Sequence, residues 1–106
     1  MDKNELITAY DDVAKLTDAA FMTGRVAIAC KEAFENKSAR AIMDGTITGK
    51  NDTERKAAAI MAFQKDYSEM NTANDAYEME KNQLDLAKLH LACLRDILRI
   101  EELAKA

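Results

Sequence analysis

The segment DGTITGKNDTERK, residues 44–56, comes closer than any other part of the chain to a phosphate-binding loop. A loop of that kind has four residues between two glycines, then Lys and a Ser or Thr, and it follows a hydrophobic strand. Here Gly45 and Gly49 enclose three residues, Asn51 stands in the place of the hydroxyl residue, and no hydrophobic strand precedes them. The pattern therefore argues against a nucleotide-hydrolysing loop and predicts a corner between two helices.

The same segment contains the signals that end one helix and begin the next. Gly45 is typical of the left-handed residue after a helix, and Asn51 followed by Glu54 is typical of a helix N-terminus. An exposed N-terminus could also receive a phosphate or carboxylate, although Asp52 and Glu54 already occupy its positive end. We expect a capped helix first and an anion contact as the alternative. The candidate contacts for an acidic partner or an anion are Lys37, Arg40, Lys50, Arg55 and Lys56.

His90 and Cys93 lie one helical turn apart, a spacing that lets two side chains meet one metal ion. A closed zinc site takes four ligands, and Cys30 is the remaining residue suited to join them. Nucleophilic catalysis needs a Ser or Cys beside a base that an acidic residue orients, and the sequence around the chain's one histidine has no signature of that complete arrangement. A helical di-iron site needs Glu three residues before the histidine, where Ala87 stands. We therefore expect no metal, no cofactor and no enzymatic activity.

The composition is that of long helices. The 106 residues include no Pro and no Trp, 48% are hydrophobic and 32% are charged, and the length suits one domain over residues 1–106. A layer of helices this small buries little apolar surface, so we expect a dimer or a larger homo-oligomer. The net charge of −4 opposes a broadly basic nucleic-acid binder, but residues 37–65 carry six Lys or Arg against three Asp or Glu.

The chain start, MDKNELITAY, lacks the basic end and apolar run of a signal peptide. No apolar run approaches the roughly 18 residues that span a bilayer. We therefore expect a cytoplasmic protein with no membrane partner. Cys30 and Cys93 stand among apolar residues, which favours buried, reduced thiols over a disulfide.

Apolar spacings of three, four and seven predict a first helix over about residues 2–36. They form one row at Leu6, Tyr10, Val13, Ala20 and Ala27, and a neighbouring row at Ile7, Ala14, Phe21 and Ile28. Residues 37–50 then read as a linker with a helical turn, and 51–64 as a short helix. Asp66 with Glu69 is a second start signal, so we expect a possible kink and a long helix over 66–103.

The last helix carries two apolar rows. The first consists of Met70, Tyr77, Leu84, Leu91 and Leu98, with Ala73, Glu80, Ala87, Leu94 and Glu101 at the second heptad position. The second row lies roughly opposite at 100° per residue, and it is the candidate oligomer interface: Leu86, Leu89, Cys93, Ile97 and Ile100. A two-helix hairpin buries one face of each helix, so the second row needs the short helix or another subunit. We expect another subunit. The predicted fold is all-α: a long antiparallel helical hairpin with a short intervening helix, in an oligomeric helical bundle.

The region around residue 70 is rich in Met and Tyr, which suits adaptable interfaces as well as core packing. These residues are Tyr67, Met70, Tyr77 and Met79.

The second half of the sequence has a recognisable order of segments. A Lys-Asn turn opens a helix that begins with Arg and Ala, and an Asp-Tyr break and a long Leu-rich helix follow. The residues concerned are Lys50, Asn51, Arg55, Ala57, Asp66 and Tyr67. This arrangement resembles small helical proteins of unknown function encoded by bacteriophages and prophages. The resemblance covers the last 60 or so residues best. It implies a phage setting, and hence a bacterial host cytoplasm, without assigning an activity.

Three functions fit these observations. The leading one is a non-enzymatic phage-type interaction module that occupies a partner's surface, such as an inhibitor of a host defence nuclease. The first alternative is a nucleic-acid-binding accessory protein that uses the basic 37–65 segment. The second is an oligomeric sponge that holds a small anionic ligand between subunits near Lys50.

Overall fold

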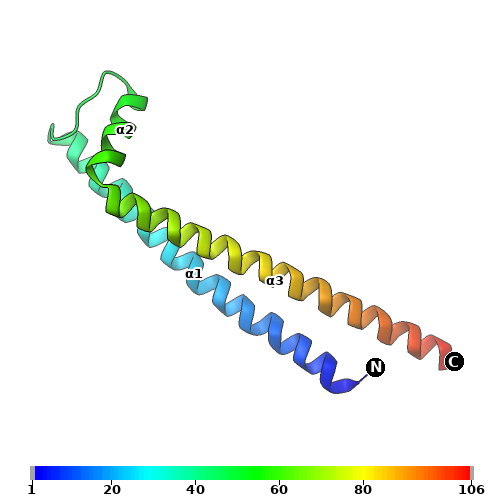
Figure 1. Ribbon diagram of the computed structural model, residues 1–106. Helices are drawn as coiled ribbons and strands as arrows, with labels where there is room; N and C mark the ends of the chain where they lie inside the picture. Colours follow the sequence, from blue (N-terminus) through cyan, green and yellow to red (C-terminus); the bar gives the residue numbers. More distant parts are fainter. Residues whose placement is uncertain (1, 106) are drawn as a thin grey trace. The chain divides into compact units, whose positions relative to one another are not determined.

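The computed structural model describes residues 2–105, which form helices α1 (Lys3–Met43), α2 (Asp52–Ala62) and α3 (Gln64–Lys105) (Figure 1). Within that described part of the chain there is no strand, which confirms the all-α class. The internal contacts divide the chain into two compact units. Unit 1 comprises the described residues up to Met22 and those from Tyr77 onward, and unit 2 comprises Thr23–Ala76.

Unit 1 is a two-helix layer in which the first half of α1 runs antiparallel to the last part of α3. Its core consists of Ala9, Leu91 and Leu94, with Leu6 and Val13 packed against them. Ala9 is 2% exposed, and its small side chain lets α3 approach the backbone of α1 closely. The expected pairing of the first and last helices is therefore present in this unit.

The inward face of α3 is the first of the two predicted rows. Leu91 and Leu94 are buried, and the other members are half-buried: Met70, Ala73, Tyr77, Glu80, Leu84, Ala87, Leu98 and Glu101. Spacings of three and four keep one face of a helix toward its neighbour. The seven-residue repeat thus predicted correctly which face of α3 packs.

Unit 2 adds α2 to the end of α1 and the start of α3. Its core joins three segments through Ala41 of α1, Ile47 of the loop and Ala59 of α2, each at most 5% exposed. Phe34, Ala58 and Phe63 pack around these residues. Ile47 belongs to the segment expected as a linker over residues 37–50, and its burial ties that loop to the core.

The corner between α1 and α2 has the predicted caps. Gly45 has a φ of 79°, the left-handed conformation that ends α1. The side chain of Asn51 accepts a hydrogen bond from the Glu54 backbone N–H at 2.9 Å. The Glu54 carboxylate in turn accepts from the Lys50 N–H at 2.8 Å. In a capping box the carboxylate would accept from the N–H of the N-cap residue, Asn51, so here the reciprocal bond involves the residue before it.

Gly49 is required by close packing. A Cβ atom at this position would lie 2.9 Å from the Arg55 backbone nitrogen and 3.0 Å from the Cβ of Glu54. The loop therefore passes directly against the first turn of α2, where a side chain has no room.

Two predicted boundaries were wrong. α1 continues to Met43 rather than ending near residue 36, because Ser38 and Ala41 still face inward while Arg40 supplies a positive charge to its last turn. α3 begins at Gln64, so Asp66 lies within its first turn and does not cap it. The break between α2 and α3 falls at Phe63, whose φ of −120° and ψ of 47° are not helical.

Replacing Gly45 with Ala should lower the free energy of unfolding by about 1 kcal/mol, because an L side chain in the left-handed region meets its own backbone. Gly45→Asn is the matched control, since Asn tolerates that conformation better and should lose less. Urea unfolding at one protein concentration measures both. If the Ala variant were as stable as the wild type, the positive φ at position 45 would not require glycine.

Candidate functional site

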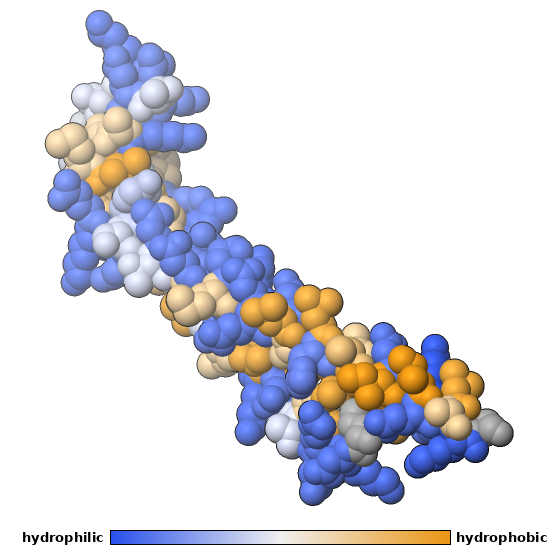
Figure 2. Space-filling model, turned by 45° about the vertical axis from the view of Figure 1, so that its right-hand side comes forward, coloured by the Kyte–Doolittle hydropathy of each residue, from blue (hydrophilic) through white to orange (hydrophobic). Residues whose placement is uncertain are grey.

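Unit 1 presents an apolar stripe on α3, on the side away from the packed row. We call it the α3 stripe: Leu86, Leu89, Cys93, Ile97 and Ile100. The exposed fractions of Leu86, Leu89 and Ile100 lie between 65% and 67%, and that of Ile97 is 40%. Figure 2 shows apolar side chains gathered in orange on this unit. The stripe was predicted from spacing alone, and within the described chain nothing covers it.

Two further side chains extend the α3 stripe. Met79 is 62% exposed and Leu103 is 69% exposed. Met79 lies seven residues before Leu86, so the same spacing that defined the stripe could have found it. Leu103 lies one turn after Ile100 and was missed because it was treated as the helix end.

The neighbouring row of α1 is exposed as well. In unit 1 its members Ile7 and Phe21 are 58% and 64% exposed, and Tyr10 of the first row is 48% exposed. Ala9 rather than Tyr10 joins Leu6 and Val13 in the core of this unit. Both helices of unit 1 therefore carry unburied apolar side chains.

The five basic candidates all lie in unit 2, but two of them are already paired. The Lys37 ammonium lies 2.9 Å from an Asp66 carboxylate oxygen. Arg55 forms an ion pair with Asp52 and donates to the Gly49 carbonyl at 3.2 Å. These partners lower the positive charge available to an outside ligand.

The other three basic candidates have no ion-pair partner within residues 2–105: Arg40, Lys50 and Lys56. They come from three different segments, the last turn of α1, the loop and α2. Lys56 lines a cavity.

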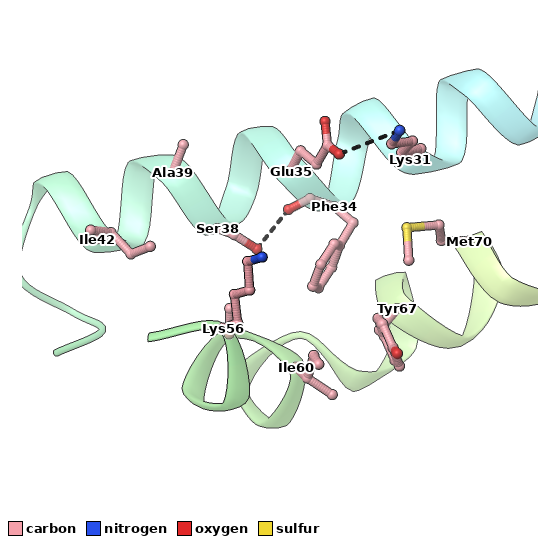
Figure 3. A pocket seen from close by; sticks show the side chains of 11 residues that line it. Lys31, Phe34, Glu35, Ser38, Ala39, Ile42, Lys56, Ile60, Tyr67 and Met70 are labelled. Carbon is pink, nitrogen blue, oxygen red and sulfur yellow. Dashed lines mark hydrogen bonds and ion pairs between the residues drawn. The ribbon is translucent and has the colours of Figure 1, made fainter. Parts of the chain in front are cut away.

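That cavity has a volume of about 450 Å³ and lies within unit 2. Its walls come from the end of α1, from α2 and from the start of α3, as Figure 3 shows. The lining is mostly apolar, and the Phe34 and Tyr67 rings lie 5.4 Å apart between their centres. Phe34, Ile42, Ile60, Tyr67 and Met70 supply its larger apolar side chains. The Met and Tyr residues near position 70 indicated an adaptable surface, but a cavity shared by three helices has no spacing signal in a sequence.

The thiols and the histidine form no cluster. Cys30 and Cys93 are free, as predicted, but Cys30 is half-buried and Cys93 is exposed, so the expectation of buried thiols was wrong. Cys93 points outward because it belongs to the α3 stripe, and His90 beside it is exposed too. Among residues 2–105 no three His, Cys, Asp or Glu side chains lie close enough together to hold a metal ion.

The carboxyl group of Asp44 has its pKa lowered by hydrogen bonds from Thr46. The Thr46 hydroxyl donates to its carboxylate at 2.6 Å, and the Thr46 backbone N–H donates to the same oxygen at 3.0 Å. These bonds favour the charged form and hold the pKa of Asp44 below its ordinary value. The charge thus helps to fix the turn that follows α1.

In comparison with known proteins, no family model, no curated protein and no solved structure matches the chain. Within the described residues, no helix is long and apolar enough to cross a membrane.

Replacing Thr46 with Val should raise the pKa of Asp44 toward its ordinary value, since one of its two hydrogen bonds is lost. Because the folded pKa is depressed, the stabilisation is present above the unfolded value and disappears as the pH falls through the folded one. The variant should therefore lose less stability on acidification than the wild type. An NMR titration of the Asp44 carboxyl measures the shift, and Thr46→Ser, which keeps the hydroxyl, should leave it unchanged. An unaltered titration in the Val variant would rule out the hydroxyl as the cause.

Proposed function

We propose that this chain is a non-enzymatic protein-interaction module that acts as a homo-oligomer. The observation that carries the proposal is the exposure of the α3 stripe on a helix whose opposite face is already packed. Fully burying one large apolar side chain contributes about 1.5–3 kcal/mol. A symmetric contact uses the same stripe from both copies, so each side chain contributes twice.

A partner protein is the second part of the proposal. The resemblance to phage-encoded helical proteins implies a bacterial host, and a small acidic module without catalytic groups acts there by occupying a surface. We assign it the role of an inhibitor of a host protein such as a defence nuclease. The exposed row of α1 in unit 1 and the three cations of unit 2 that have no ion-pair partner among residues 2–105 support contact with a protein that has apolar and acidic groups.

The alternative function is a nucleic-acid-binding accessory protein. The structure of the basic 37–65 segment supports it less than the composition of that segment does. Lys37 and Arg55 are neutralised by carboxylates of the same chain. Nucleic-acid affinity depends on many cations that are free to meet phosphates.

The double variant Leu89→Gln, Ile100→Gln should dissociate the oligomer, because it removes two large apolar side chains from each copy. We expect the dissociation constant to rise at least about hundredfold. Size-exclusion chromatography with light scattering measures the mass across a dilution series.

The matched control is Lys88→Gln, Arg99→Gln, which places the same residue type at exposed positions beside the stripe on α3. It should keep the wild-type mass. A wild-type protein that is monomeric at high concentration would overturn the oligomer part of the proposal.

The partner part predicts that immobilised wild-type chain recovers a bacterial protein from a host lysate. Arg40→Gln, Lys50→Gln should reduce the recovery severalfold at low salt and less at high salt, because exposed charges are screened. Quantitative mass spectrometry gives the readout, with Lys105→Gln as a control for loss of charge in unit 1. Recovery of no protein by the wild type would contradict the inhibitor role.

A further inference from the structure

The cavity of unit 2 has the size and lining of a small-ligand site. Its volume of about 450 Å³ falls within the roughly 300–1,000 Å³ of pockets that hold small organic molecules. Aromatic, aliphatic and thioether side chains from α1, α2 and α3 form most of the wall. Such a surface favours an apolar body over water, because water in it loses hydrogen bonds.

The polar groups at the rim are few and are mostly engaged. The Ser38 hydroxyl donates to the Phe34 carbonyl at 2.8 Å, so its hydrogen is committed. Glu35 lies 3.9 Å from Lys31, and Figure 3 shows both side chains turned away from α2. Their opposite charges largely offset each other at this exposed position.

Lys56 is the exception. It makes no ion pair within residues 2–105, and Figure 3 shows its side chain extending from α2 toward Ser38 of α1, across the cavity. One uncompensated cation beside an apolar wall matches one negative charge on an apolar body. A dianion or a polar sugar would lose hydration here without enough partners to replace it.

We propose that this cavity binds a medium-chain alkyl carboxylate, with the carboxylate on Lys56 and the chain packed against the cavity faces of Phe34, Tyr67 and Met70. The Lys56 ammonium donates a charge-assisted hydrogen bond to the carboxylate. Met70 is unbranched and adapts to a flexible chain. This site lies in unit 2 and is independent of the oligomer contact proposed for unit 1.

The probe is decanoate, titrated into the full chain by calorimetry, with 1-decanol as the neutral ligand of equal chain length. Decanoate should bind about tenfold more tightly than decanol, the factor that one charge-assisted hydrogen bond contributes. Lys56→Gln should weaken decanoate about tenfold and leave decanol unchanged. Lys65→Gln, a lysine of unit 2 that does not line the cavity, should change neither.

A second pair of variants tests the location. Ala39→Phe places a large ring at a cavity-lining position that is exposed, so the helix tolerates it, and it should abolish binding of both ligands. Ala33→Phe makes the same change on α1 outside the lining and should bind like the wild type. Circular dichroism confirms that each variant is folded.

Three results would overturn the proposal. The first is no decanoate binding by the wild type, and the second is equal affinity for decanoate and decanol. The third is that the wild type binds no decanoate but recovers a bacterial protein from the lysate, and that the Ala39→Phe variant fails to recover this protein. That result would assign the cavity to a partner's side chain. Light scattering on the same samples reads the oligomeric state separately, so the two proposals fail independently.

Discussion

A two-helix layer can bury one face of each helix, and this constraint governs unit 1. Ala9 meets Leu91 and Leu94, and the small alanine brings the two backbones together along a narrow contact. Everything beyond that contact remains at the surface, however apolar it is. The exposure of Leu86, Leu89 and Ile100 therefore follows from the architecture and is no accident of local sequence. A third helical layer, from a copy or a partner, is the general way in which proteins cover such a face.

Unit 2 meets the same constraint with a helix of its own. α2 is only 11 residues long and is rich in alanine, so it closes the corner without filling it. Ala59 packs in the core and also lines the cavity, because its side chain is too short to reach the far wall. The chain has few large side chains that face inward. This leaves the cavity unfilled in unit 2 and the α3 stripe uncovered in unit 1. Among the described residues, four of the seven buried apolar side chains are alanines.

The parts of the fold that depend on local repetition could be predicted from the sequence, and the parts that depend on distant contacts could not. The row through Leu84, Leu91 and Leu98 identified the packed face of α3, and Asn51 with Gly45 identified the corner. The end of α1 and the start of α3 were misplaced because their residues are held by each other, as Lys37 and Asp66 show.

Side-chain burial was the least predictable level. Ile47 reads as a loop residue, yet the turn fixed by Asp44 and Gly45 carries it into the core. Cys93 reads as a buried thiol, yet its row is the one that the hairpin cannot cover. The cavity depends on which small residues of three different helices face each other. The spacing of residues within one segment cannot predict such contacts. The candidate site in unit 1 was therefore predictable, whereas the one in unit 2 required the structure.

The burial of Ile47 also has a kinetic meaning. Ala41, Ile47 and Ala59 lie close together in the chain, so their contact closes a short loop. Ala9 and Leu91 are separated by most of the chain, and their contact closes a long one. The entropy of loop closure grows with length, and long-range contacts form slowly unless shorter ones bring the ends together. The corner is thus the favoured place for folding to begin, with α1 and α3 pairing from there toward the termini.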